Sequence, residues 1–280
     1  MANLVIGPRP FVKWVGGKRQ LLKQFHELGL FSDKFDNNTN RYYEPFVGGG
    51  AVFFDLRPKN ATISDLNGEL ITTYRVIRDD VDSLINSLKK HTYSKEYFLD
   101  IRAKDPMNMD PLDVASRFIY LNRTCFNGMY RVNSKGRFNV PFGRYKNPII
   151  CDEDNLRAVS SALRNVEILN EDYKFVLQEA KPGDFIYFDP PYYPINTTSS
   201  FTSYTKDGFA EKEQTELRDT FDKLSRRGCF VMLSNSDTPF IHSLYSNVEN
   251  AKITIVKAGR AINSKSTGRG KITEVVITNY

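Results

Sequence analysis

Short β-rich hydrophobic runs alternate with longer amphipathic stretches along most of the chain. Four of these runs end at an acidic or small polar residue: 41–43 before Glu44, 61–64 before Asp65, 185–188 before Asp189, and 230–233 before Ser234. Continuous apolar runs of this length are typical of strands buried on both faces of a parallel sheet. Helical periodicity is found between them, at residues 18–28, 68–78 and 211–227. This alternation predicts an α/β fold with a doubly wound, mostly parallel sheet, which binds ligands at the carboxyl ends of its strands.

Residues 83–163 break this rhythm. Helical patterns cover 81–90, 94–103 and 112–124, and a basic segment rich in Gly and Asn follows them. We interpret this region as a helical insertion that ends in a basic hairpin. The predicted domains are therefore an α/β domain made of residues 1–80 and 165–280, and an insertion of residues 81–164. Near the end of the chain, residues 252–256 and 274–278 are predicted to form an antiparallel pair.

The composition excludes several classes of protein. With 280 residues, 40% of them hydrophobic and 26% charged, the chain fits a folded globular protein rather than a disordered one. No apolar run approaches the ~18 residues of a membrane helix, and the first residues lack the features of a signal peptide. Three cysteines and three histidines are scattered along the sequence, which argues against a disulfide framework or a metal site. We expect no metal, no membrane partner and a cytoplasmic location.

The positive charge is concentrated in two segments that contain no acidic residue. The first spans residues 114–151 and the second 251–272, and without them the chain has 26 basic and 33 acidic residues. The basic residues of the first segment are Arg117, Arg123, Arg131, Lys135, Arg137, Arg144 and Lys146. Aromatic residues are interleaved with them, so cations for phosphates and planar groups for bases occur together, which favours a nucleic acid as partner. Solvated loops are the alternative.

A glycine-rich turn follows the first predicted strand, from Glu44 to Gly50, and Asp65 lies twenty-one residues after Glu44. Glycines allow backbone N–H groups to approach a ligand, and an acidic residue at the end of the next strand can accept ribose hydroxyls. The dinucleotide pattern G-x-G-x-x-G is absent. Because Glu44 would repel a pyrophosphate and attract a sulfonium, the turn favours S-adenosylmethionine over a dinucleotide. A purely structural turn is the alternative.

The tetrad Asp189-Pro190-Pro191-Tyr192 ends the predicted strand 185–188. The exocyclic amine of a nucleobase is a poor nucleophile because its lone pair is delocalised into the ring. A carboxylate and the carbonyl of Pro190, held rigidly by proline, can each accept one N–H and favour the pyramidal nitrogen that attacks a methyl group. Tyr192 offers a face on which the base can stack. The amine of a paired base is inaccessible, so such a site requires base flipping.

These motifs stand in the order found in a known family. The chain resembles the Dam-type DNA adenine-N6 methyltransferases, in particular the GATC-specific branch with the DpnII-type modification enzymes, over nearly its whole length. Residues 13–18 match K-W-x-G-G-K, 46–50 match F-x-G-x-G, 189–192 give D-P-P-Y, and 201–204 match F-x-x-Y. The resemblance implies the fold of a class I S-adenosylmethionine-dependent methyltransferase, with residues 81–164 as the target-recognition insertion.

The resemblance also implies residue roles in cofactor binding. The residues implied to contact S-adenosylmethionine are Trp14, Lys18, Asp65 and Asp189, with Glu44, Phe46, Gly48 and Asp172 as further candidates. Asp172 follows a predicted strand at 166–169, and an ordinary helix N-cap is the alternative interpretation of this residue.

The residues implied to contact DNA lie in 126–133 and 138–145. By resemblance, Arg131 pairs with a guanine edge, Met129 and Pro141 lie near thymine methyl groups, and Phe126 wedges into the base stack. Arg144 and Tyr145 hold phosphate, and Asn127 and Asn133 complete the set. A second basic loop, residues 257–271, is expected to grip phosphates or to be an ordinary surface loop. Ser234 and Asn235 either line the base pocket or cap the next helix.

Together, these features predict an enzyme that transfers the methyl group of S-adenosylmethionine to adenine N6 in double-stranded DNA, within GATC. Asp189, Pro190 and Tyr192 are the predicted catalytic residues, and transfer is direct and in line. A monomer is favoured, with the oligomeric state left open. The alternatives are an enzyme acting on cytosine N4 or an RNA amine, and a DNA-binding protein that has lost catalysis.

Overall fold

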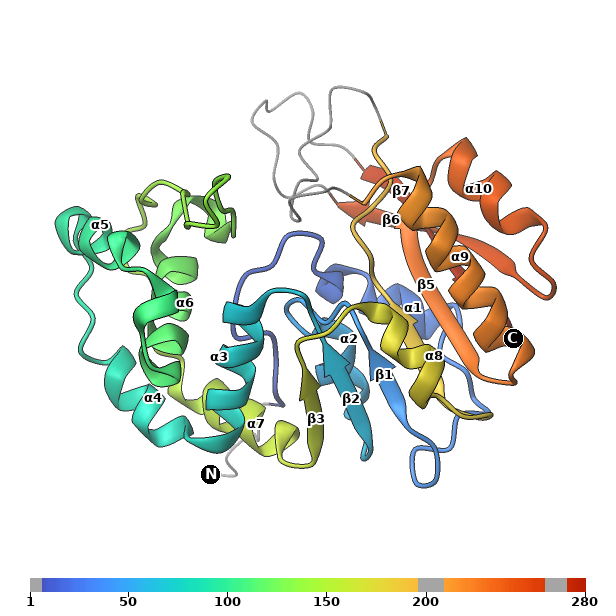
Figure 1. The fold of residues 1–280 in the computed structure, drawn as a ribbon, viewed down its shortest axis with the longest axis horizontal. Helices are drawn as coiled ribbons and strands as arrows, with labels where there is room; N and C mark the ends of the chain where they lie inside the picture. The colour runs from blue at the N-terminus through green and yellow to red at the C-terminus, as the bar shows by residue number, and fades with distance from the viewer. Residues whose placement is uncertain (1–6, 196–208, 260–270) are drawn as a thin grey trace. The chain divides into compact units, whose positions relative to one another are not determined.

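The computed structural model describes residues 7–195, 209–259 and 271–280 (Figure 1). The predicted F-x-x-Y segment at 201–204 and most of the second basic loop, 257–271, lie outside these residues. The chain divides into two compact units. We call residues 1–17, 47–57 and 65–170 the helical unit, and residues 18–46, 58–64 and 171–280 the sheet unit. The predicted boundaries of the recognition insertion, 81–164, concern its function and stay a prediction.

The described strands form one sheet of seven with the order β3-β2-β1-β4-β5-β7-β6. Their bounds are β1 Tyr42–Glu44, β2 Ala61–Ser64, β3 Val166–Leu169, β4 Phe185–Phe188, β5 Phe230–Ser236, β6 Lys252–Gly259 and β7 Lys271–Thr278. Strands β2, β1, β4 and β5 pair in parallel, whereas β7 pairs antiparallel with β5 and with β6. The predicted α/β fold with a mostly parallel sheet is confirmed.

The hydrophobic runs form the buried centre of this sheet. Every residue of β1, β2 and β4 is buried, as expected for strands covered on both faces. One boundary differs from the prediction, because β5 continues beyond Leu233 to Ser236. The antiparallel strand β7 lies beside it, and pairs Val276 with Ser234 and Val275 with Asn235. The two polar residues thus lie within a strand rather than after it.

The helices of the sheet unit pack through their apolar faces. In α9, Glu211–Arg226, the buried residues are Gln214, Leu217, Thr220, Phe221 and Leu224, a spacing that turns one face toward the sheet. This helix packs on β5, with α8 (Val176–Glu179) and α10 (Pro239–Ser246) beside it (Figure 1). The predicted helix at 18–28 is divided into a 3-10 turn, Lys18–Gln20, and α1, Leu22–Glu27.

The helical unit contains α2 Ala51–Leu56, α3 Gly68–Asp79, α4 Val81–Leu88, α5 Lys95–Ala103, α6 Pro111–Thr124 and α7 Glu153–Leu163. Most begin at a side chain that accepts a hydrogen bond from the first turn, and these caps are Asn67, Asp80, Ser94, Asp110 and Asp152. Helix α3 packs against α6 and α7. The three predicted helices of the insertion are therefore present as α4, α5 and α6.

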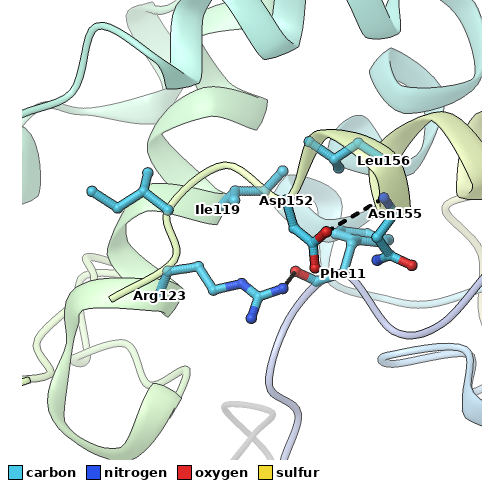
Figure 2. Close-up of a pocket in the computed structure, with 7 residues that line it drawn as sticks. Phe11, Ile119, Arg123, Asp152, Asn155 and Leu156 are labelled. Carbon is cyan, nitrogen blue, oxygen red and sulfur yellow. Dashed lines mark hydrogen bonds between the residues drawn. The ribbon is translucent and has the colours of Figure 1, made fainter. Parts of the chain in front are cut away.

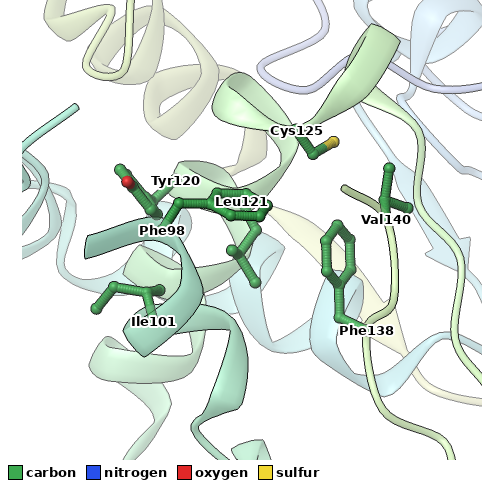
Figure 3. Packing of buried hydrophobic residues seen from close by; sticks show 7 residues of the cluster. All are labelled: Phe98, Ile101, Tyr120, Leu121, Cys125, Phe138 and Val140. Carbon is green, nitrogen blue, oxygen red and sulfur yellow. The ribbon is translucent and has the colours of Figure 1, made fainter. Parts of the chain in front are cut away.

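The basic segment after α6 is anchored by a hydrophobic cluster. Antiparallel bridges join Cys125 to Phe142 and Val132 to Phe138, which gives the predicted hairpin without extended strands. Figure 3 shows Phe138 and Val140 packed with Phe98 of α5 and with residues of α6. Aromatic and aliphatic side chains that fill such a cluster fix the hairpin on the helices.

None of the described helices is long and apolar enough to cross a membrane. The same part of the chain contains no cluster of three His, Cys, Asp or Glu side chains arranged to hold a metal ion.

Candidate active site and nucleic-acid interface

The carboxylate of Asp189 forms an ion pair with Lys18 directly after β4. The ammonium Nζ of Lys18 lies 2.6 Å from Oδ1 and 2.8 Å from Oδ2 of Asp189, and the Lys18 side chain is only 3% exposed. Burial raises the pKa of Asp189 to about 6, although Lys18 opposes this shift by stabilising the charged form. Asp189 is thus ionised at neutral pH and can accept hydrogen bonds.

The backbone after Asp189 is fixed by buried amides. Gln214 of α9 donates from Nε2 to the Pro191 carbonyl at 3.0 Å, and Asn235 of β5 donates to Gln214 Oε1 at 2.9 Å. The Tyr193 N–H in turn donates to Asn235 Oδ1 at 3.1 Å. Gln214 and Asn235 are both fully buried, where hydrogen bonds are costly to lose. Asn235 does not cap α10, because Thr238 accepts from the first turn of that helix.

Three carboxylates create a negative potential around the buried Tyr187 in β4. Burial raises the pKa of Tyr187 well above its usual value, and the charges of Asp189, Glu44 and Glu274 raise it further. Glu44 ends β1, is 2% exposed, and accepts a hydrogen bond from the Tyr42 hydroxyl at 2.7 Å. A negative potential at the carboxyl ends of β1 and β4 suits a positively charged ligand.

Phe46 and Asp172 lie at the same edge of the sheet unit in different roles. The Phe46 ring stacks on Tyr173 with centroids 5.3 Å apart and meets Phe188 edge-on. Asp172 accepts a hydrogen bond from the Lys174 N–H at 3.0 Å and caps the short 3-10 helix Tyr173–Phe175. The N-cap reading of Asp172 is confirmed, and its contact with a cofactor stays a prediction.

In the helical unit, Trp14 and Gly48 form a close contact that requires glycine. Gly48 has a φ of +47°, and a Cβ at this position would lie 2.5 Å from Cδ1 of Trp14. Asp65 directly follows β2, and its Oδ2 accepts from the Gly48 N–H at 3.1 Å while Oδ1 accepts from Asn67 at 2.9 Å. Burial raises the pKa of Asp65, and these two backbone bonds oppose the shift. Each carboxylate oxygen retains a lone pair for a ligand hydroxyl.

Trp14 also joins the N-terminal motif to the predicted recognition segment, residues 126–145. Its ring stacks on Tyr130 at 5.9 Å with an interplanar angle of 24°. Next to it, the buried Asn122 of α6 accepts from the Lys13 N–H at 2.8 Å and donates to the carbonyls of Lys13 and Gly128 at 2.8 and 3.0 Å. One amide therefore fixes both the chain before Trp14 and the turn that presents Phe126.

The predicted base-reading residues differ in exposure. The Phe126 side chain is 52% exposed. The next residue, Asn127, has a φ of +56° and lies in a tight turn. Arg131 is exposed, and it donates to Asn139 twice, from Nε to Oδ1 at 2.8 Å and from Nη2 to the backbone carbonyl at 3.4 Å. Pro141 is exposed, whereas Met129 is partly buried against the hydrophobic cluster.

The remaining predicted DNA contacts include side chains with structural bonds. Asn133 Oδ1 accepts from the N–H groups of Lys135 and Arg137, which closes the hairpin turn. The Tyr145 hydroxyl donates to the Cys125 carbonyl at 3.0 Å, and Lys13 Nζ lies 4.4 Å from the Tyr145 ring centroid. Arg144 is exposed. Lys13, on the same unit, is an additional cation beside these residues.

Two basic residues of the first acid-free segment do not belong to a surface patch. Arg117 is 2% exposed and forms an ion pair with Glu69 at 2.8 Å. Figure 2 shows Arg123 turned toward Phe11, to whose carbonyl it donates at 2.7 Å, in a recess lined by Asp152 and Asn155. The predicted patch of seven cations is therefore wrong in extent. The exposed basic residues of this segment are Arg131, Lys135, Arg137, Arg144 and Lys146.

Comparison with known proteins identifies the class. Residues 14–262 match the family described as D12 class N6 adenine-specific DNA methyltransferase, and the chain belongs to this family. It is therefore an adenine-specific DNA methyltransferase, as predicted. Membership implies S-adenosylmethionine as methyl donor and DNA as substrate. Family membership argues against the alternatives of an enzyme acting on cytosine N4 or on an RNA amine, and of a DNA-binding protein without catalysis.

Individual relatives are similar over almost their whole length. The chain is 47% identical to the type II methyltransferase M1.LlaDCHI of Lactococcus lactis subsp. cremoris, over 98% of this chain and 96% of the relative. It is 45% identical to the type II methyltransferase M.MjaIII of Methanocaldococcus jannaschii, with coverages of 97% and 99%. It is 34% identical to a DNA adenine methylase of Vibrio cholerae, with coverages of 96% and 95%. The predicted motifs thus belong to a chain that matches these enzymes throughout.

Proposed function

We propose that this enzyme methylates adenine N6 within GATC in duplex DNA, after extruding the adenine from the helix, by direct in-line transfer. The observation that carries the proposal is the ionised carboxylate of Asp189, which Lys18 holds at the end of β4 and which precedes a rigid Pro-Pro-Tyr segment. An acceptor of fixed position beside an aromatic ring is the arrangement that activation of a base amine requires.

In this proposal, the two N–H bonds of the target amine are donated to Asp189 and to the Pro190 carbonyl. The neighbouring Pro191 carbonyl already accepts from Gln214, which fixes the peptide and directs the amine to Pro190. S-adenosylmethionine supplies a methyl group activated by its sulfonium. As the nitrogen forms its bond to the methyl carbon and the carbon–sulfur bond breaks, the amine loses one proton. The Asp189 carboxylate, with its pKa raised to about 6, accepts that proton more readily than an ordinary aspartate.

The residues proposed to contact the cofactor are Trp14, Lys18, Glu44, Phe46, Gly48, Asp65, Asp172 and Asp189. Three observations support a fit to S-adenosylmethionine. The negative potential around Tyr187 suits a sulfonium, Asp65 has lone pairs left for ribose hydroxyls, and Phe46 belongs to an aromatic group suited to a purine ring.

The proposed DNA contacts are those of the exposed hairpin. Arg131 pairs with guanine O6 and N7 through Nη1 and the second N–H of Nη2, since Asn139 already accepts from Nε and from one N–H of Nη2. Phe126 fills the space of the extruded base. Met129 and Pro141 contact thymine methyl groups, and Arg144 holds phosphate together with Asn127, Asn133 and Tyr145.

The test is single-molecule sequencing of plasmid DNA from a methylation-free bacterial host that expresses the chain. We expect modified adenines confined to GATC, and none in cells that express the Asp189→Ala variant. Adenine marks at another sequence would refute the GATC specificity and keep the chemistry. Absence of marks, despite stabilisation of the purified protein by S-adenosylhomocysteine, would refute the proposed reaction.

A further inference from the structure

The ring of Tyr192 is held by charged groups at two places. Its hydroxyl donates to Oε2 of Glu274 at 2.8 Å, and Lys18 Nζ lies 4.8 Å from the ring centroid. The same Nζ is paired with Asp189. Tyr192 therefore contacts Lys18, the partner of the proposed proton acceptor Asp189, and a second carboxylate, Glu274.

Glu274 occupies a rigid position in the sheet. It lies in β7, where it is opposite Ser236 of β5 and Val256 of β6. A residue with a strand paired on each side has a fixed backbone, so its carboxylate is an anchor that moves little. The Tyr192 backbone follows two prolines, whose φ angles are fixed.

The phenol remains a hydrogen-bond donor to this carboxylate. Burial raises the pKa of Tyr192 well above its usual value, and the charges of Asp189 and Glu274 raise it further. A neutral hydroxyl that donates to an ionised carboxylate forms a charge-assisted bond, which is stronger than a bond between neutral groups.

We propose that Glu274 is a positioning residue for methyl transfer, which holds the Tyr192 ring in the orientation that stacks the extruded adenine beside Asp189. This inference rests on the proposed function. No sequence motif marks Glu274, and its role follows from the bond between β7 and the segment after β4.

Glu274 has a second effect on the same site through its charge. The charged and titratable groups coupled to Asp189 are Lys18, which lowers its pKa, Glu274, which raises it, and Tyr42, Tyr187 and Tyr192, whose pKa values its charge raises. Removing the charge of Glu274 while keeping an oxygen acceptor therefore separates its two effects. The hydrogen bond is retained, and the pKa of Asp189 decreases.

The experiment measures single-turnover methyl transfer to a GATC duplex as a function of pH for four variants. Glu274→Ala and Tyr192→Phe each remove the hydrogen bond, one from each end, and both are expected to slow transfer by tenfold or more with little change in DNA affinity. The double variant should transfer the methyl group no more slowly than either single variant. The effects of two substitutions that break the same bond do not add. Glu274→Gln should recover most of the rate and move the acidic limb of the profile to lower pH.

The exposed Glu249→Ala variant is the matched control and should retain the rate and the pH profile. A merely structural role would lower Tm in Glu274→Ala and leave the single-turnover rate of the folded protein at the wild-type value. Wild-type rates in both Tyr192→Phe and Glu274→Ala, or additive losses in the double variant, would overturn the inference. Full activity of Asp189→Ala would instead refute the proposed function, so the two failures are distinguishable.

Discussion

The two units hold their functional side chains by different means. In the sheet unit, Asp189 is fixed by a buried ammonium, and buried amides hold the backbone that follows it. In the helical unit, Phe126 and Arg131 are exposed, and neutral groups such as Asn122 and Asn139 support them. The proposed chemistry therefore depends on a buried charge with a shifted pKa, whereas the proposed base recognition depends on side chains that remain accessible.

Asp189→Ala gives the largest expected effect and tests the buried half of this comparison. The variant loses the acceptor for the amine and leaves Lys18 buried without its partner, so we expect methyl transfer to fall below detection. DNA affinity in a fluorescence anisotropy titration should stay within about twofold, because the interface residues are unchanged. The exposed Asp219→Ala on α9 is the matched control. Surviving turnover would remove Asp189 from the mechanism.

Arg131→Ala tests the exposed half. We expect a loss of about 1–3 kcal/mol of discrimination at the guanine, since a bidentate pair is removed. The measurement compares kcat/KM on GATC with substrates that carry a substituted guanine. Lys135→Ala, also exposed in this hairpin, should weaken binding to all sequences equally. An unchanged sequence profile for Arg131→Ala would exclude this residue from base recognition.

Asn122→Ala tests whether the uncharged, buried amide of Asn122 stabilises the predicted interface. Lys13 and Gly128 lose three hydrogen bonds with a buried amide, so we expect the free energy of unfolding to fall by about 1–3 kcal/mol. Urea denaturation measures the change, with the exposed Asn147→Ala as control. Equal stabilities would show that the turn Phe126–Gly128 is held by other contacts.

The pH dependence is the smallest effect at neutral pH and sharpens the contrast between buried and exposed charge. Asp189 must be ionised to accept the amine, so kcat/KM should fall about tenfold per unit below pH 6, the approximate pKa of this residue. Between the ordinary pKa of aspartate and about 6, the folded state binds more protons than the unfolded state. The contribution of Asp189 to the free energy of unfolding therefore decreases as pH rises through this range. A flat profile down to pH 5 would contradict the assignment.

Local sequence predicted much of the sheet and singled out several candidate site residues. Runs such as 185–188 are apolar on both faces, and this pattern is independent of distant residues. Motifs also singled out Lys18 and Asp189, although their pairing joins residues 171 positions apart.

The remaining features depend on partners far away in the sequence. The length of β5 depends on pairing with β7, and Gln214 and Glu274 are ordinary polar residues until the fold places them beside Pro191 and Tyr192. Likewise, the local charge of the insertion gives no sign that Glu69 pairs with Arg117. Helices α2 and α7 were not predicted.

The inward orientation of Arg117 and Arg123 has a consequence for the ionic strength at which the enzyme works. Each phosphate neutralised by a protein cation releases about 0.9 of a condensed counterion. With five exposed cations in this segment rather than seven, its greatest contribution to the slope of log affinity against log salt concentration is about −4.5 instead of about −6.3. Binding through this hairpin should therefore survive a rise in salt better than the sequence charge suggests.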